Sequence, residues 1–178
     1  MRSMTPEQAE FWLQQILLGA LKNESRTTRG VLEAVPADKG DHRPDSASRT
    51  ALDLVRHIAI AEKRFVETPI KGMFDVSATS VPESVKTPAE IAAWYADSFA
   101  QNFEKLSQLK GEQLAKTIDF RGMFQMPAVG FLDLGLRHSI HHRGQLCSYL
   151  RCMGAKVPAI YGESYDSAQA KQAAQTAR

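Results

Sequence analysis

The chain has 178 residues, of which 43% are hydrophobic, and 22 basic against 20 acidic side chains give it a formal net charge of +2. This size and apolar content suit a single domain with a buried core. The charges are well mixed, and the longest apolar run, residues 16–21, is far shorter than the roughly 20 residues of a membrane span, so we expect neither nucleic acid nor a membrane as partner.

The first helix is predicted over residues 5–35. Thr5 is placed to cap it, and Pro6 takes the first helical position, where its missing N–H costs nothing. Glu24 and Thr28 lie in the polar middle of a stripe that is apolar at both ends. Either the two side chains face a site inside the protein, or the stripe rotates slightly and both of them meet water.

A second helix is predicted after the loop at 36–49. It begins at the cap residue Thr50 and is expected to end at Pro69. His57 lies on the apolar face of this helix. An isolated histidine on a buried face is usually a hydrogen-bonded core residue, so His57 becomes a ligand candidate only with partners elsewhere in the chain.

A longer loop, residues 69–86, precedes the third helix. The helix starts at Thr87, followed by proline at the first position and by Glu90 three residues after the cap, the pattern of a capping box. We expect the helix to run to Gly111, a suitable C-terminal residue. Its aromatic residues are interpreted as core.

The segment 112–127 is predicted to be irregular, with 117–120 extended at best, and it leads into a helix over 131–153. His138 and His142 lie one turn apart on this helix, so their imidazoles can converge on one small ion. Two histidines at this spacing also occur in ordinary core packing. One stripe of the helix carries both, and its members are Leu134, His138, His142, Gln145 and Tyr149.

The two cysteines, Cys147 and Cys152, lie on the same predicted helix. Five residues of helix separate them, and their directions differ too much for a disulfide bond. They are therefore interpreted as reduced thiols. Because reduced thiols are typical of reducing compartments, the expected location is the cytoplasm.

Four long helices with short or medium loops, and no convincing strand pair, predict an all-α four-helix bundle. The expected topology is up-down, with the longer loop between helices 2 and 3 and the irregular segment before helix 4. We assign residues 1–162 to this domain. The tail, 163–178, has few large apolar residues and is expected to be disordered or frayed.

The sequence resembles the DinB superfamily. The likeness rests on ALDLVRHIAIAEKRF, which contains His57, and on RHSIHHRGQLCSYLRCMG followed by KVPAIYG, and it extends from the first helix to about Gly162. Its most specific part is the run H-x-x-x-H-R-G-Q combined with one histidine on the second helix. The resemblance implies a bundle whose metal is held by His57, His138 and His142. The family is separate from the DNA polymerase that shares its label, so no nucleic-acid function is implied.

Relatives in this superfamily include enzymes that use low-molecular-weight thiols such as bacillithiol and mycothiol. The resemblance therefore implies one divalent metal ion, zinc or nickel, a thiol co-substrate and a small-molecule substrate. The implied activity is that of a thiol-dependent S-transferase in which the ion activates a thiolate or a water. The resemblance implies no catalytic residue other than the three metal ligands. The family also tends towards homodimers.

Four residues are candidates for a substrate pocket, although each is equally explained as ordinary structure: Glu24, Thr28, Gln145 and Tyr149. Arg143 either binds an anionic group or forms a pair on the helix surface or between helices. Two other functions stay open, a non-catalytic metal- or small-molecule-binding bundle and a metal-dependent hydrolase. A further interpretation has no metal at all, with the histidines simply packing.

Overall fold

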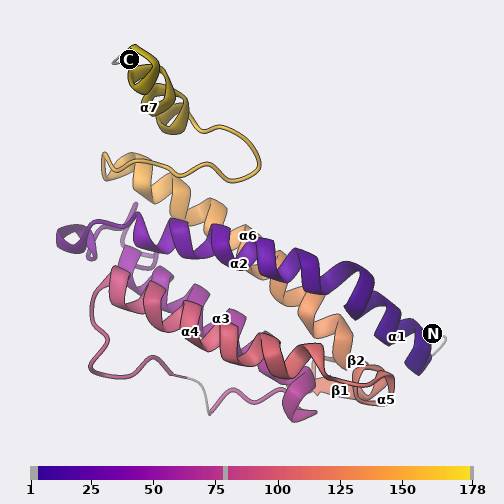
Figure 1. The fold of residues 1–178 in the computed structure, drawn as a ribbon. Helices are drawn as coiled ribbons and strands as arrows, with labels where there is room; N and C mark the ends of the chain where they lie inside the picture. Colours follow the sequence, from indigo (N-terminus) through magenta and orange to yellow (C-terminus); the bar gives the residue numbers. More distant parts are fainter. Residues whose placement is uncertain (1–3, 78–79, 177–178) are drawn as a thin grey trace.

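The computed structural model describes residues 4–77 and 80–176, and within these the chain is mostly helical with one small two-stranded sheet (Figure 1). The all-α class predicted from the sequence is thus broadly confirmed. The outer ends of the predicted domain and tail, residues 1–3 and 177–178, lie outside the described part. So do two residues, 78 and 79, of the loop predicted over 69–86.

The predicted first helix is confirmed as one continuous helical segment in three parts. These are α1 (Pro6–Trp12), a π-helical turn η1 (Leu13–Leu17) and α2 (Leu18–Glu33). Thr5 forms the expected cap and is part of a capping box. The loop that follows contains a short 3₁₀ turn, η2 (Ala37–Lys39).

Helix α3 (Ala51–Lys71) begins as predicted, with the Asp53 N–H donating to the Thr50 hydroxyl at 3.1 Å. The expected end at Pro69 is wrong, because the helix continues past the proline to Lys71. Proline in the last turn removes only one backbone hydrogen bond. The helix closes instead at Gly72, which has φ 67°.

Helix α4 (Pro88–Ser107) starts with the predicted capping box at Thr87. Gly111 does not cap it, as the sequence suggested, but opens a further helix, α5 (Gly111–Ala115). A Cβ atom at Gly111 would lie 2.4 Å from the carbonyl oxygen of Pro6. Glycine is therefore required here because α5 packs closely against the start of α1.

The segment predicted to be irregular contains a β-hairpin instead, so the expectation of no strand pair was wrong. Strands β1 (Thr117–Phe120) and β2 (Phe124–Pro127) pair antiparallel around a tight turn. The turn places Arg121 at φ 58° and Gly122 at φ 74°. The hairpin is stabilised by tertiary contacts, since Phe120 joins a cluster of aromatic rings: Phe65, Phe74, Phe120, Phe124 and Phe131.

Helix α6 (Ala128–Cys152) begins earlier than the predicted residue 131 and is closed by Gly154, at φ 70°. The tail expected to be disordered or frayed forms a helix, α7 (Tyr165–Thr176), with no buried residue. In Figure 1 it lies apart from the other helices. Asp166 anchors it through an ion pair with Arg151, at 2.6 Å, and by accepting from the Val157 N–H, at 2.9 Å.

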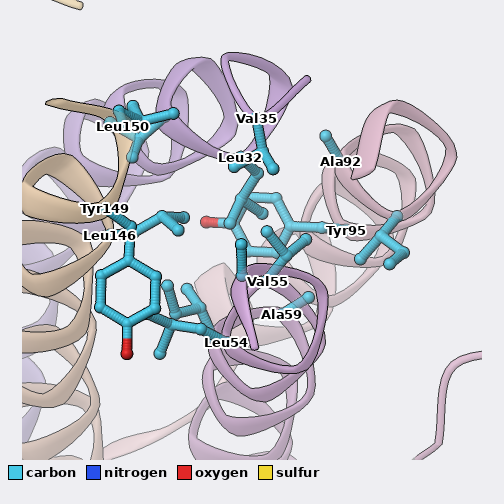
Figure 2. Close-up of a cluster of buried hydrophobic side chains, with 14 of the residues drawn as sticks. Leu32, Val35, Leu54, Val55, Ala59, Ala92, Tyr95, Leu146, Tyr149 and Leu150 are labelled. Carbon is cyan, nitrogen blue, oxygen red and sulfur yellow. The ribbon is translucent and has the colours of Figure 1, made fainter. Parts of the chain in front are cut away.

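The packing order of the helices determines which faces meet. Helix α3 packs against both α4 and α6, and α2 also contacts both of these. Figure 2 shows one core layer built from all four: Leu32, Val35, Leu54, Val55, Ala59, Ala92, Tyr95, Leu146, Tyr149 and Leu150. Of the helices described, none combines the length and the apolar character that a membrane crossing needs.

Candidate metal centre

Three histidines from two helices meet at the interface between α3 and α6. The Nε2 atom of His57 lies 3.1 Å from that of His138 and 3.2 Å from that of His142. Their candidate ligand atoms all lie within 4.8 Å of one another, and the three residues form the metal-type cluster found among the described residues. The predicted meeting of these side chains across two helices is therefore confirmed.

The sequence brings the two helices close at this level through a glycine. Gly135 lies one turn before His138 on α6, and a Cβ atom there would lie 2.6 Å from Cβ of Phe65 on α3. Any larger residue would push the helices apart. Of all helix pairs described, α3 and α6 share the most extensive contact. Gly135 is a supporting residue that our sequence analysis did not identify, because close approach cannot be recognised without the partner helix.

The spacing of the nitrogens fits a shared divalent ion. With metal–nitrogen bonds of about 2.0–2.1 Å, two ligands on one ion lie about 3.0 Å apart in octahedral geometry and about 3.4 Å apart in tetrahedral geometry. The observed separations of 3.1 and 3.2 Å fall between these limits. Three imidazoles on one side would leave coordination positions open for other ligands.

The electrostatic environment keeps the rings neutral, as metal ligands must be. Burial, followed by the positive charge of Arg49, lowers the pKa of His57 to about 4. Burial also lowers the pKa of His138 to about 4, and that of His142 in the same direction. At neutral pH the three histidines therefore present lone pairs and not charges.

The outer nitrogens of the rings differ in their partners. Nδ1 of His142 lies 2.9 Å from Oε1 of Gln145. Because an amide oxygen only accepts, Nδ1 carries the proton and Nε2 keeps its lone pair for a metal. Nδ1 of His138 is buried and has no hydrogen-bond partner among the described residues. The outer nitrogen of His142 is thus held by Gln145, whereas that of His138 is held by packing alone.

Of the four predicted pocket residues, Gln145 is the one that hydrogen-bonds to a histidine of the cluster in the described part of the chain. Tyr149 is buried, and its hydroxyl donates to the backbone oxygen of Arg49 at 3.3 Å. The positive charge of the Arg49 side chain contributes to the lowered pKa of all three histidines. A role of Tyr149 in substrate binding stays a prediction.

Glu24 and Thr28 lie on α2 and contact Arg143, not the histidines. Arg143 is 1% exposed, and its guanidinium pairs with Glu24 at 2.5 Å and donates to the Thr28 hydroxyl at 3.3 Å. It also donates to the hydroxyl of Tyr161 at 2.7 Å. Of the two interpretations of Arg143, the pair between helices is the observed one, and a pocket role of Glu24 and Thr28 stays a prediction.

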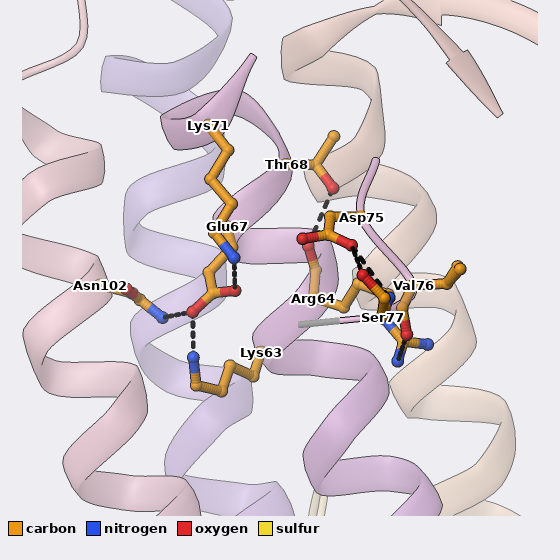
Figure 3. Close-up of polar contacts among 9 residues, drawn as sticks. All are labelled: Lys63, Arg64, Glu67, Thr68, Lys71, Asp75, Val76, Ser77 and Asn102. Carbon is orange, nitrogen blue, oxygen red and sulfur yellow. Dashed lines mark hydrogen bonds and ion pairs between the residues drawn. The ribbon is translucent and has the colours of Figure 1, made fainter. Parts of the chain in front are cut away.

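Further along α3, a second group of charges ties this helix to α4 (Figure 3). Glu67 accepts from Lys63 and Lys71 on its own helix and, at 3.4 Å, from the Asn102 amide of α4. Glu67 is 8% exposed. Because its carboxylate lies between two lysines, we interpret these charges as a structural contact between α3 and α4.

A cavity of about 270 Å³ opens between α2 and α4, away from the histidines. Phe99 and Phe103 supply its apolar side, with Lys22 and Arg26 among the other lining residues. None of the three histidines lines it. The cavity and the histidine cluster are therefore separate features.

Comparison with known proteins gives a consistent result. The DinB family model matches residues 11–176. The uncharacterized protein YjoA of Bacillus subtilis is 28% identical over 129 residues, which cover 71% of this chain and 82% of that protein.

Two crystal structures of DinB-like proteins share the fold. That of YjoA from Bacillus subtilis has a TM-score of 0.69 at 24% identity and covers 83% of this chain and 99% of its own. That of a protein from Bacillus cereus has a TM-score of 0.69 at 23% identity and covers 83% of this chain and 97% of its own.

Proposed function

Since the chain belongs to the DinB family, we propose that it is an up-down four-helix bundle that binds one divalent metal ion through His57, His138 and His142. The observation that supports this proposal is the convergence of three Nε2 atoms at 3.1 and 3.2 Å. Zinc and nickel are the first candidates, because imidazole nitrogen suits several late divalent metals. Three neutral imidazole ligands favour neither zinc nor nickel over the other.

The activity we propose is S-transfer from a low-molecular-weight thiol to a small electrophile. The thiolate sulfur forms a bond to the electrophilic carbon, the leaving group departs with its electron pair, and the thiol proton goes to solvent. When bound, the ion supplies Lewis-acid chemistry that lowers the pKa of a thiol or a water. The protein holds the three imidazoles neutral through burial, and Gln145 fixes the tautomer of His142.

A second candidate is metal or small-molecule binding without catalysis. In the described part of the chain, the polar atoms within hydrogen-bond distance of the ring nitrogens are those of the rings themselves and of Gln145. No carboxylate is among them, so a general base beside the site is lacking from these contacts. A metal-dependent hydrolase would use the same ligands, with water in place of the thiol.

Metal analysis of protein purified without a histidine tag tests the binding step. We expect about one ion per chain in the wild type and loss of that ion in His138→Ala. His141→Ala is the matched control, because His141 is a neighbouring exposed histidine that does not belong to the cluster. Unchanged metal content in His138→Ala would exclude the three-histidine site.

A thiol assay separates the enzyme from the binder. Metal-loaded and metal-free protein are incubated with a panel of thiols and a bromobimane electrophile, and conjugation is followed by fluorescence. We expect a faster rate with metal for at least one thiol, and a loss of this acceleration in His142→Ala. Equal rates with every thiol and metal would favour the non-catalytic candidate, and turnover of an ester without thiol would favour the hydrolase.

We also propose a cytoplasmic location and a homodimer. Cys147 and Cys152 are both free, as expected in a reducing compartment. The dimer follows from the family tendency alone. Light scattering on the purified protein gives its mass directly, and a mass of one chain would contradict the dimer.

A further inference from the structure

In addition to the three histidines, the bundle contains a buried carboxylate whose presence metal binding does not explain. Glu62 of α3 is 4% exposed. Its carboxylate accepts hydrogen bonds from the Tyr95 hydroxyl of α4 and, at 2.7 Å, from the Ser139 hydroxyl of α6. Burial raises the pKa of Glu62, and these bonds oppose the shift. A carboxyl group in a bundle core is costly, so its place calls for a reason.

The position of Ser139 suggests the reason. On α6, each metal-ligand candidate is followed by a residue bonded inside the core: His138 by Ser139, and His142 by Arg143. Ser139 and Arg143 are each 1% exposed. Successive residues of a helix point about 100° apart. Hydrogen bonds that hold Ser139 and Arg143 in the core therefore also fix the direction in which the neighbouring histidines point. We call the residues on the inner face and their partners the core polar cluster: Glu24, Thr28, Glu62, Tyr95, Ser139 and Arg143.

A small rotation of α6 would be enough to disperse the histidines. An imidazole nitrogen lies about 6 Å from the axis of its helix, so a rotation of about 20° moves it by about 2 Å. Metal ligands tolerate errors of only about 0.2 Å in bond length. The apolar contacts between the helices limit such a rotation, but hydrophobic attraction has no preferred direction. A directed hydrogen bond in the core resists it more strongly.

We propose that Glu62 is a positioning residue for the metal centre, and that through Ser139 it holds α6 in the rotation that presents His138 and His142 to His57. This inference rests on the proposed metal binding and goes beyond it. Glu62 lies on the same helix as His57, so the bond to Ser139 links the two helices that carry the ligands. Tyr95, the other donor, comes from α4, which carries no ligand.

Two single-hydroxyl deletions test the inference. Ser139→Ala and Tyr95→Phe each remove one donor from the same carboxylate, so both disturb the core in a comparable way. Only Ser139 belongs to a ligand-bearing helix. Zn²⁺ affinity is measured by competition with a chromogenic chelator, and the visible spectrum of the Co²⁺ form reports the ligand geometry. Far-UV circular dichroism and thermal unfolding verify that both variants are folded.

We expect Ser139→Ala to bind Zn²⁺ roughly tenfold more weakly, or worse, as found for residues that orient metal ligands, with an altered Co²⁺ spectrum. Tyr95→Phe should stay within about twofold of the wild type, with its spectrum unchanged. Equal losses in the two variants, or no loss in either, would overturn the inference while leaving the metal centre intact. A wild type that binds no metal would instead overturn the proposed function and the inference together.

Discussion

The histidine cluster and the core polar cluster are built from neighbouring residues of α6, and yet their atoms are satisfied differently. In the core polar cluster, Arg143 has partners on α2 and Ser139 donates to Glu62. In the histidine cluster, Nε2 of His57 lies within hydrogen-bond distance of the Nε2 atoms of both His138 and His142, and Nε2 of His142 carries a lone pair and no proton. The core polar cluster pairs donors with acceptors, whereas the histidine cluster brings three like nitrogen atoms together.

This difference separates polar groups that hold the fold from polar groups that we propose as ligands of a cation. Buried polar atoms are normally paired within the protein. Three imidazole nitrogens that converge on one point are an exception, and they support the proposed cation site. Removing a member of the core polar cluster should therefore reduce stability, and at Ser139 it should also reduce metal affinity because Ser139 positions the ligands. Removing a histidine should reduce metal affinity. The predictions below follow from this division, in order of expected effect.

Arg143→Ala should give the largest loss of stability, about 3 kcal/mol, because it leaves Glu24 and Thr28 without a buried partner. The measurement is urea unfolding of the metal-free protein. Arg137→Ala is the matched control on the same helix, since Arg137 is 75% exposed in its pair with Asp133. It should cost less than about 0.5 kcal/mol. Similar losses in both variants would contradict the structural role of the core polar cluster.

Lowering the pH should destabilise the metal-free protein through the histidine cluster. Histidine titrates near 6.5 in the unfolded chain, whereas the pKa of His57 and of His138 in the folded protein is about 4. Below pH 6.5 the unfolded chain therefore binds protons that the folded chain refuses. The stability is fully present above about pH 6.5 and is lost as the pH falls towards 4. Allowing for the half-exposed rings, we expect a loss of about 1–3 kcal/mol.

Urea unfolding at several pH values checks this, with His57→Ala as the comparison. The variant should show a shallower decline between pH 6.5 and 4, because one depressed histidine is gone. A decline that is equally steep in the variant would place the pH dependence outside the histidine cluster.

Gln145→Ala should weaken Zn²⁺ binding by about tenfold, since it removes the acceptor that fixes the tautomer of His142. In the described part of the chain, the half-buried amide of Gln145 bonds to His142 and not to the core polar cluster, so the stability of the metal-free protein should change little. Gln145→Glu keeps an acceptor oxygen and should retain the affinity. If the alanine variant binds as tightly as the wild type, the contact at 2.9 Å has no role in the site.

Truncation after Gly162 should have the smallest effect, less than about 1 kcal/mol, because it leaves both clusters intact. Helix α7 buries no residue, and its ion pair between Asp166 and Arg151 is partly exposed. Thermal unfolding and Zn²⁺ titration of the shortened protein measure both quantities. A drop of many degrees, or a loss of metal binding, would show that α7 supports the bundle.

Local signals in the sequence predicted the long helices and their beginnings. Thr5, Thr50 and Thr87 each accept from the backbone as expected of a cap. The histidine pair on α6 followed from helical spacing. Its third partner, His57, was assigned through the resemblance to a known family, because residues on separate helices carry no sign of which faces will meet.

The features that were missed depend on tertiary contacts. The hairpin at 117–127 forms because Ile118 and Phe120 pack against α3 and α6. Each strand alternates polar and apolar residues over only four positions, which is too short a pattern to predict a strand pair by itself. Gly111 looked like the end of a helix and instead opens one, since α5 presses against Pro6. Glu62 gave a weak signal, as a charged residue one turn from the core positions Ile58 and Phe65, which we did not use.

X-ray absorption spectroscopy of the protein loaded with one equivalent of Zn²⁺ tests the central claim most directly. The account predicts three imidazole nitrogens at about 2.0–2.1 Å, with the remaining positions taken by light atoms from solvent or buffer. Sulfur at about 2.3 Å, which would have to come from Cys147 or Cys152, or fewer than three imidazoles around the ion, would contradict it.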